Sequence, residues 1–270
     1  MVSHPHRPRI IPVLLLRSNG LLHKTVRFKH PKYVGDPRIA VKIFNDKGAD
    51  EIVVLDIDAT PERRSPKLPL IEEIAGEAFM PMAYGGGIRT VDEARKILSL
   101  GVEKVVINSA ALENPSLVGQ IARVVGSQSV VGSIDVKRDL LGRRRVVSES
   151  ATRKWPTDPV SRARALVREG VGEIFVTSVD RDGTFEGYDV ELCESIASVV
   201  DVPVIACGGA KTVSDLGLVI TRGRASAAAA GSMFVFQGPH RAVLISFPDD
   251  ASLIAVLGSK DRPTKSSYPK

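Results

Sequence analysis

Two clusters of glycine in this chain could bind phosphate groups. Gly86 and Gly87 follow one short apolar run, and Gly208 and Gly209 follow another. Glycine lets backbone N–H groups approach a phosphate closely, and a serine that opens a helix adds a hydroxyl and free N–H donors. Each cluster is followed, one apolar run later, by such a turn, Asn108-Ser109 and Gly231-Ser232 respectively. A single cluster would indicate a tight turn, but the matched pair indicates a ligand with a phosphate at each end.

A carboxyl group at the end of a further apolar run could transfer protons. That run ends in Asp135, which can act as a general acid or base if it faces a bound ligand. The alternative is a plain ion pair with the neighbouring Lys137 or Arg138. The residue type alone leaves both interpretations open.

The segment 180–184 is the second candidate for ligand contact. Its polar groups come directly after an apolar run and include Asp182, Gly183 and Thr184. Carboxylate and hydroxyl oxygens can bind ligand hydroxyl groups, and the glycine allows close approach of the backbone. An ordinary Asp-Gly turn is the alternative.

Four charged residues stand at the opposite ends of such runs, where catalysis is not expected. They are Arg9, Glu51, Lys104 and Glu173, two positive and two negative. Each alone is a solvated strand end, but together they could close a ring of ion pairs if the four runs lie in one barrel.

The pattern of apolar runs predicts the elements that would position these groups. Eight short runs rich in β-branched residues alternate with longer amphipathic segments, several of which open with Asp or Thr and close with Gly. The predicted strands are Ile10–Leu15, Glu51–Asp56, Met80–Tyr84, Lys104–Asn108, Ser129–Asp135, Glu173–Ser178, Val202–Cys207 and Ala225–Gly231. The predicted helices include Pro37–Gly48, Val91–Leu100, Pro115–Val125, Pro159–Gly170, Val190–Val199 and Val213–Arg222. This order favours an α/β fold of the (β/α)8 barrel type, whose reactive groups lie at the carboxyl ends of the strands.

The chain also resembles itself. The glycine clusters, the serine-bearing turns and two acidic strand ends recur at a nearly constant separation of about half the chain. We therefore expect one barrel domain over 1–258, built from half-barrels at about 9–125 and 126–248, with a flexible tail at 259–270. In this repeat the counterpart of Asp135 is Leu15, so one half presents a carboxylate and the other does not.

Composition limits the functional classes. The chain has 270 residues, 43% of them hydrophobic, and a formal charge of +6. Its basic residues are scattered, which favours a field that attracts phosphorylated metabolites over a nucleic-acid surface. Its apolar runs are too short for a membrane span. We expect a cytoplasmic protein with Cys193 and Cys207 as reduced thiols, no metal, no cofactor, and neither nucleic acid nor membrane as partner.

Ordered motifs from about Arg9 to Phe236 resemble the cyclase subunit of imidazole glycerol phosphate synthase, the HisF-like family. The motifs are Arg9-Ile10-Ile11-Pro12, Leu55-Asp56-Ile57, Gly85-Gly86-Gly87-Ile88, Ile107-Asn108, Glu113-Asn114-Pro115-Ser116, Gly126-Ser127-Gln128, Ile134-Asp135 and Thr177 to Thr184. The resemblance implies a two-phosphate barrel that receives ammonia from a glutaminase (HisH-like) subunit docked at its N-terminal face. The four charged residues match the family's ammonia gate.

The resemblance also assigns catalytic positions. In the family, an aspartate on the first strand and one on the fifth carry the acid/base steps. Here these positions hold Leu15 and Asp135, while Lys24 matches a lysine that contacts the substrate. Since leucine cannot transfer a proton, cyclisation is expected to be impaired.

Several segments look like a divergent, WbuZ-like branch associated with nucleotide-sugar amidation in surface polysaccharide synthesis. They are Val13 to Arg17, Phe28 to Pro37 and Gly238 to Ile245. The first hypothesis is therefore a barrel that passes ammonia to a separate sugar amidotransferase. The alternative is a histidine-biosynthetic cyclase that converts ribulosyl aminoimidazole carboxamide phosphate and ammonia to imidazole glycerol phosphate. A non-catalytic scaffold is the third.

Overall fold

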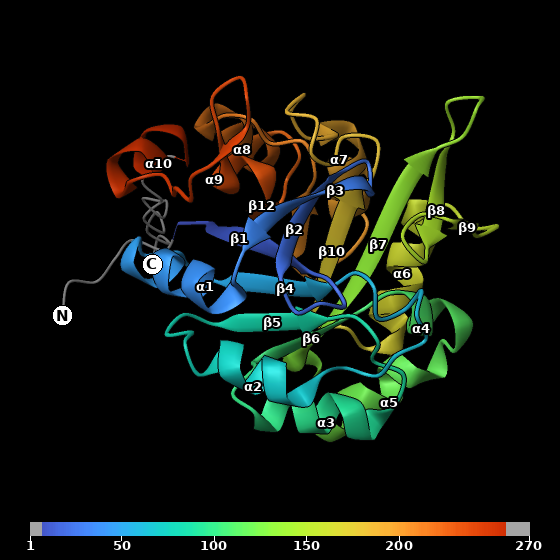
Figure 1. The fold of residues 1–270 in the computed structure, drawn as a ribbon. Coiled ribbons are helices and arrows are strands. Elements are labelled where there is room, and N and C mark those ends of the chain that lie inside the picture. Colours follow the sequence, from blue (N-terminus) through green and yellow to red (C-terminus); the bar gives the residue numbers. More distant parts are fainter. Residues whose placement is uncertain (1–6, 258–270) are drawn as a thin grey trace, which may run out of the picture.

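Eight parallel strands form a closed barrel at the centre of the protein (Figure 1). The computed structural model describes residues 7–257. Each barrel strand pairs in parallel with the next along the chain, and the last pairs with the first. In order around the barrel they are β1 (Arg9–Leu16), β4 (Ile52–Asp56), β5 (Met82–Gly85), β6 (Lys104–Ile107), β7 (Val130–Arg138), β10 (Glu173–Ser178), β11 (Val204–Cys207) and β12 (Ala227–Ala230).

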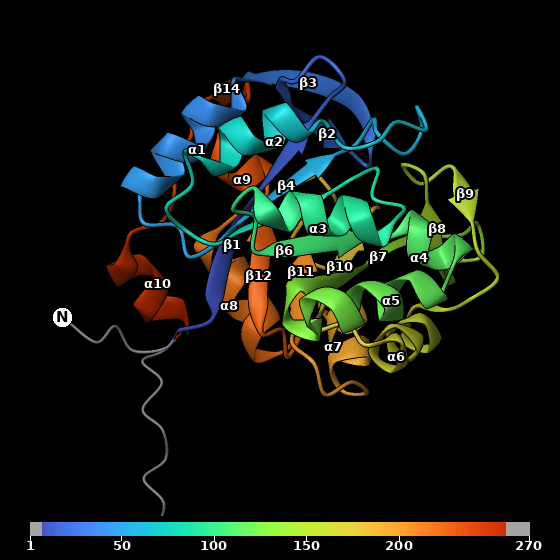
Figure 2. The same ribbon diagram turned by 90° about the horizontal axis from the view of Figure 1, so that it is seen from below.

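Helices lie outside the strands, as the two perpendicular views show (Figures 1 and 2). The helices that follow successive barrel strands are α1 (Pro37–Asp46), α2 (Leu68–Ala75), α3 (Val91–Ser99), α4 (Ser109–Glu113), α5 (Ser116–Val125), α6 (Pro159–Glu169), α7 (Val190–Ala197), α8 (Val213–Thr221), α9 (Ser232–Val235) and α10 (Asp250–Leu257). A short 3-10 helix, η1 (Ser127–Ser129), precedes β7. The predicted (β/α)8 barrel is thus confirmed.

Local sequence signals explain where several of these helices begin and end. Asp36, Asp158 and Asp189 accept hydrogen bonds from the first-turn N–H groups of α1, α6 and α7. Thr90 forms a capping box with Glu93 at the start of α3. Such caps satisfy N–H groups that have no partner within the helix, so they fix the direction in which each helix leaves the barrel.

Two apolar clusters occupy the two sides of the barrel wall. The larger lies between strands and helices and includes Phe44, Tyr84 and Phe234. The smaller fills the barrel interior and consists of Ile11, Val13, Val53, Ala83, Val106, Val131, Phe175, Ile205, Ala227 and Ala229. Because both faces of the strands are buried, the strands are almost continuously apolar. Fully burying one Val, Leu, Ile or Phe side chain contributes about 1.5–3 kcal/mol.

Two antiparallel hairpins extend the barrel and were not predicted. The first joins β2 (Leu22–Val26) and β3 (Lys29–Gly35), and β2 pairs with the end of β1. The second joins β7 to β8 (Arg144–Ser148) and β9 (Arg153–Lys154), and it rises beyond the barrel wall in Figure 1. A further pair, β13 (Phe236–Gln237) and β14 (Ala242–Val243), follows α9.

The second hairpin corrects one predicted strand end. The fifth barrel strand does not stop at Asp135 but continues to Arg138, because Asp135 to Arg138 pair with Val147 to Arg144 of β8. Asp135 is therefore held within a strand that is paired on both sides.

All eight predicted strands are present at nearly the predicted positions, and so are the predicted helices. Helix α10, which packs against α8, was not predicted. The half-barrel boundaries stay predictions. The expected tail at 259–270 lies outside the described residues.

Candidate active site

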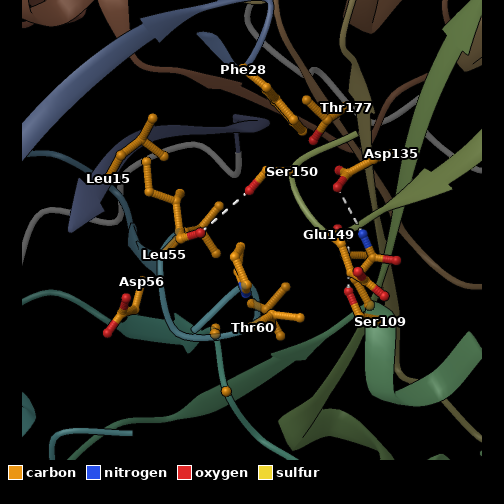
Figure 3. Close-up of a pocket in the computed structure, with 18 of the residues that line it drawn as sticks. Leu15, Phe28, Leu55, Asp56, Thr60, Ser109, Asp135, Glu149, Ser150 and Thr177 are labelled. Carbon is orange, nitrogen blue, oxygen red and sulfur yellow. Dashed lines mark hydrogen bonds between the residues drawn. The ribbon is translucent and has the colours of Figure 1, made fainter. Parts of the chain in front are cut away.

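A cavity of about 620 Å³ opens at the carboxyl ends of the barrel strands. Its floor contains strand residues that point inwards, and its rim consists of the loops after these strands, including parts of both hairpins. This is the end of the barrel at which enzymes of this architecture place their active sites. Figure 3 shows an apolar wall with Leu15 and Leu55 on one side and polar side chains with Asp135 and Thr177 on the other.

Asp135 is the central proton-carrying group of the polar wall. Its Oδ2 accepts a hydrogen bond of 2.8 Å from Asn108 Nδ2, and Thr177 is a second hydrogen-bond partner. Burial disfavours the charged form and raises the pKa of Asp135 to about 7. Among the described residues, neither lysine nor arginine pairs with Asp135, so the alternative of an ion pair with Lys137 or Arg138 is not what the structure contains.

Asn108 also carries a buried acceptor beside the cavity. Its side-chain Oδ1 is buried and has no hydrogen-bond partner in the described part of the chain. A buried acceptor without a partner costs free energy. Asn108 therefore holds Asp135 with its amide N–H while its own oxygen stays shielded from solvent.

Leu15 lies across the barrel from Asp135. It ends the inward-facing side of β1 and packs with Leu55 against the apolar interior cluster. The wall at this point presents methyl groups. Leu15 can exclude water and shape a ligand, but it cannot transfer a proton.

Lys24 and Asp182 lie together where the first hairpin crosses the mouth of the barrel. Lys24 is buried and donates to the backbone oxygen of Val13, and burial lowers its pKa to about 8. Thr25 Oγ1 donates to Asp182 Oδ2 at 3.2 Å, and burial raises the pKa of this carboxyl. Both Lys24 and Asp182 line the cavity, whereas Thr184 bonds to the oxygen of Arg181 and closes its own turn.

The first glycine cluster faces the cavity. Gly86 and Gly87 line it with φ angles of 114° and 75°, which favour glycine. A side chain at Gly87 would stand 2.6 Å from the backbone oxygen of Arg64. Asn108 and Ser109 lie beside the cluster on the same cavity wall. Backbone donors, a hydroxyl and nearby arginines thus gather on this side of the mouth.

The second glycine cluster is placed differently. Gly208 and Gly209 have φ angles of 97° and 106°, but neither they nor Ser232 line the cavity. A side chain at Gly208 would stand 2.7 Å from the oxygen of Ser178, and Gly209 accepts a backbone hydrogen bond from Gly187. Of the remaining predicted residues, Gly231 lines the cavity, where a side chain would meet Lys24. A side chain at Gly183 would meet the backbone oxygen of Thr25. The structure therefore does not gather this cluster around the cavity, and a second phosphate site stays a prediction.

The four charged residues at the strand starts form a closed ring. Arg9 pairs with Glu51 and Glu173. Lys104 Nζ lies 3.1 Å from Glu51 Oε1 and 2.8 Å from Glu173 Oε2. Charges alternate around the ring, and both carboxylates are buried. The ring stands at the N-terminal end of the barrel, and the apolar interior cluster separates it from the cavity.

Some cavity residues were missed by sequence reasoning. They include Phe28, Arg63, Arg89, Glu149, Ser150, Arg153 and Thr177 as individual site residues. Most lie on loops without a glycine or strand-end signal, and the second hairpin that brings Glu149 and Ser150 to the cavity was not predicted. Thr177 stands at a strand end, and that position was the available signal.

The fold and the cavity define a (β/α)8 barrel protein with its ligand site at the carboxyl ends of the strands. Residues 9–240 match the family model described as histidine biosynthesis protein. A Pseudomonas aeruginosa protein, provisionally named imidazole glycerol phosphate synthase subunit hisF2, is 57% identical over 243 residues, which is 90% of this chain and 96% of that protein. The chain belongs to the HisF-like cyclase family.

Two further relatives carry the same kind of name. An Alkaliphilus metalliredigens protein named imidazole glycerol phosphate synthase subunit HisF is 45% identical over 229 residues, covering 85% of this chain and 90% of the relative. A Leptospira interrogans protein with the same name, given provisionally, is 45% identical over 244 residues, covering 90% and 96%. These names favour the cyclase alternative over the first hypothesis, because none of them refers to polysaccharide synthesis.

Within residues 7–257, no helix has the length and apolar character needed to cross a membrane.

Proposed function

We propose that this chain is the ammonia-using cyclase subunit of an imidazole glycerol phosphate synthase. Its substrate would be ribulosyl aminoimidazole carboxamide phosphate, and its product imidazole glycerol phosphate. The observation that carries this proposal is the position of Asp135, a half-buried carboxyl on the wall of a cavity that also holds glycine-rich backbone donors and a serine hydroxyl. The names of the relatives support the same reaction.

The residues around the cavity suggest how the substrate is held. Gly86, Gly87 and Ser109 would bind one phosphate through backbone N–H groups and a hydroxyl. Lys24 would contact the middle of the substrate near Asp182. Asp135, with a pKa near 7, is suited both to donate and to accept a proton at neutral pH.

Ammonia would enter at the opposite end of the barrel from a glutaminase subunit. The relatives are named as subunits, which supports a partner protein. The ring of Arg9, Glu51, Lys104 and Glu173 stands at the N-terminal end, so a partner docked there would meet four alternating charges around the barrel axis. We propose this ring as the gate that ammonia passes.

Leu15 supports a second candidate function. Without a carboxyl on β1, the barrel could pass ammonia to a separate sugar amidotransferase, in the manner of the WbuZ-like branch and nucleotide-sugar amidation. The apolar wall of Leu15 and Leu55 is the specific observation in its favour. In this function the ring would be needed and cyclisation would not.

One pair of assays separates the two functions. The purified barrel is supplied with ribulosyl aminoimidazole carboxamide phosphate and ammonium chloride, and separately the glutaminase activity of its partner is measured with and without the barrel. The cyclase function predicts imidazole glycerol phosphate in the first assay. Stimulation of the glutaminase without any product in the first assay would instead support delivery. If the barrel neither changed the glutaminase activity nor formed imidazole glycerol phosphate, both functions would be contradicted.

A further inference from the structure

The loop after β8 holds an unusual backbone conformation at the edge of the cavity. Glu149, Ser150 and Ala151 have φ angles of 53°, 57° and 64°, so three consecutive residues other than glycine are left-handed. Each such residue costs of the order of 1 kcal/mol or more, and such conformations persist where surrounding contacts impose them, often at ligand sites. The contacts around this loop therefore fix its backbone at the edge of the cavity.

Hydrogen bonds within the loop and to two neighbouring segments of the barrel hold the loop in place. Thr152 donates to the backbone oxygen of Glu149 through its N–H at 3.2 Å and its hydroxyl at 2.6 Å. The N–H of Glu149 donates to Ser109 Oγ at 3.5 Å. Ser150 Oγ donates to the oxygen of Ile57 at 3.4 Å, on the side of β4 (Figure 3). The loop is thus anchored to the segments after β4 and β6, the two strands that flank β5 and the first glycine cluster.

This arrangement brings the Glu149 carboxylate to the cavity on the same side as Asp135. Glu149 lines the cavity, and Figure 3 shows it next to Ser109 and below Asp135. Its Oε1 lies 3.3 Å from Arg153 Nη1. The same guanidinium is held by Glu113 at 2.8 Å and stacks on the ring of Trp155 at 4.3 Å. Glu149 is therefore a carboxylate positioned by a cation that it shares with Glu113.

Asp135 and Glu149 lie in different environments. An acid/base pair requires such a difference, because one carboxyl must donate a proton and the other must accept one. Asp135 is desolvated and its hydrogen-bond partners are uncharged. The Glu149 side chain keeps 35% of its surface exposed and has a cationic neighbour. Two carboxyls in unlike environments on one cavity are suited to different roles, one as proton donor and the other as proton acceptor.

We propose that Glu149 is the second proton-transfer carboxyl of this cavity and supplies, from the loop after β8, the acid/base function that Leu15 cannot supply from β1. The proposal rests on the proposed cyclase function. It names a residue for which neither the repeat in the sequence nor the first-strand position gives any indication.

The proton transfers balance for the addition of ammonia to the substrate's ketone. The nitrogen lone pair forms the new bond to the carbonyl carbon, Asp135 gives its proton to the carbonyl oxygen, and the Glu149 carboxylate takes a proton from nitrogen. In the elimination, Glu149 returns its proton to the leaving hydroxyl, which departs as water. The nitrogen loses a proton to Asp135 as the imine forms. Ketone and ammonia thus give imine and water, and both carboxyls regain their starting states.

The test compares Glu149→Gln with a matched control. Glu113→Gln removes the other carboxylate that holds Arg153 and that also lines the cavity. With ribulosyl aminoimidazole carboxamide phosphate and ammonium chloride, E149Q should lose about 10²-fold or more in kcat with KM nearly unchanged. E113Q loosens Arg153 but keeps the Glu149 carboxyl, so its loss in kcat should be at least about tenfold smaller than that of E149Q. In Glu149→Ala, added formate should restore part of the lost kcat, which a purely structural role would not allow.

The outcomes distinguish this inference from the function on which it rests. If the unaltered protein forms no imidazole glycerol phosphate, the proposed cyclase function fails, and this inference with it. If the unaltered protein turns over and E149Q keeps at least half of its kcat, the inference alone is overturned. Equal losses in E149Q and E113Q, carried by KM and without formate rescue, would also overturn it, because they would show that Glu149 acts only by holding Arg153.

Discussion

Leu15 on β1 and Asp135 on β7 lie on diametrically opposite strands of the barrel, and both side chains line the same cavity. Three strands separate them in either direction around the barrel, namely β4, β5 and β6 on one side and β10, β11 and β12 on the other. A ligand between them meets hydrocarbon on one wall and a proton-carrying carboxyl on the other. Groups that can transfer a proton are therefore concentrated on the Asp135 side of the cavity.

Replacing Leu15 by aspartate should raise cyclase turnover. A carboxyl at this position faces the cavity opposite Asp135, and a positioned acid/base group contributes about 10²- to 10⁴-fold in rate. We expect L15D to increase kcat with ammonium chloride by at least about tenfold, because Glu149 already supplies part of this function. Leu15→Asn is the control, since an amide has a similar shape but transfers no proton. An equal increase in L15N would contradict the proton-transfer explanation.

Asp135 should make stability depend on pH. Its pKa in the folded state is about 7, above the value of about 3.9 expected in the unfolded chain, because burial penalises the charged form. Between these values the folded state binds more protons, so the free energy of unfolding should fall as pH rises from about 4 to about 7. Urea unfolding at several pH values should show this decline in the unaltered protein and a weaker one in Asp135→Asn. If the unfolding free energies of the two proteins changed with pH by the same amount, Asp135 would not be the source of this pH dependence.

Lys24 should act in the opposite sense at higher pH. Burial lowers its folded-state pKa to about 8, below the unfolded value of about 10.4. The unfolded chain then binds more protons between about pH 8 and pH 10.4, so the contribution of Lys24 to stability increases with pH in that window. The unfolding free energy of the unaltered protein minus that of Lys24→Met should therefore increase with pH in this window. A difference that stays constant across the window would exclude a depressed pKa.

The ring at the N-terminal end should be costly to break. Glu51 is buried and contacts both Arg9 and Lys104, so Glu51→Gln leaves two cations sharing Glu173. Removing one partner of a buried ion pair typically costs about 3–5 kcal/mol of unfolding free energy. Glu103→Gln is the matched control, because Glu103 stands beside Lys104 but is exposed, and its loss should lie within about 0.5 kcal/mol. The ring would lose its structural importance if both variants unfolded at the same urea concentration.

The same pair of variants tests the gate. If the ring transmits between the two ends of the barrel, E51Q should alter the stimulation of the partner glutaminase, and E103Q should not. Measuring glutamine hydrolysis with each variant, at barrel concentrations that saturate the partner, separates transmission from binding. Identical stimulation by E51Q and the unaltered barrel would argue against a gate.

The barrel could be predicted from sequence because local signals and the global fold agree. Each strand is a short apolar run, and helices such as α3 and α6 begin at capping residues that sequence alone identifies, Thr90 and Asp158. The ring that contains Arg9 and Glu51 could be predicted because the starts of parallel barrel strands meet at one end of the barrel.

The two hairpins could not be predicted in the same way. β3 is largely exposed and carries two lysines, so it has no apolar alternation to identify it. β8 and β9 depend on pairing with the extension of β7 beyond Asp135. Lys24 could be placed from the family resemblance, but its burial and the position of Glu149 depend on these hairpins, and tertiary contacts decide both.

The central proposal is that Asp135 performs proton transfer in ammonia-dependent cyclisation within this cavity. The most direct measurement is the formation of imidazole glycerol phosphate from ribulosyl aminoimidazole carboxamide phosphate and ammonium chloride by the purified barrel and by Asp135→Asn. We expect the unaltered protein to form product and D135N to be slower by about 10²- to 10⁴-fold at similar KM. No product from the unaltered protein at high enzyme concentration, or equal rates for the two proteins, would contradict the proposal.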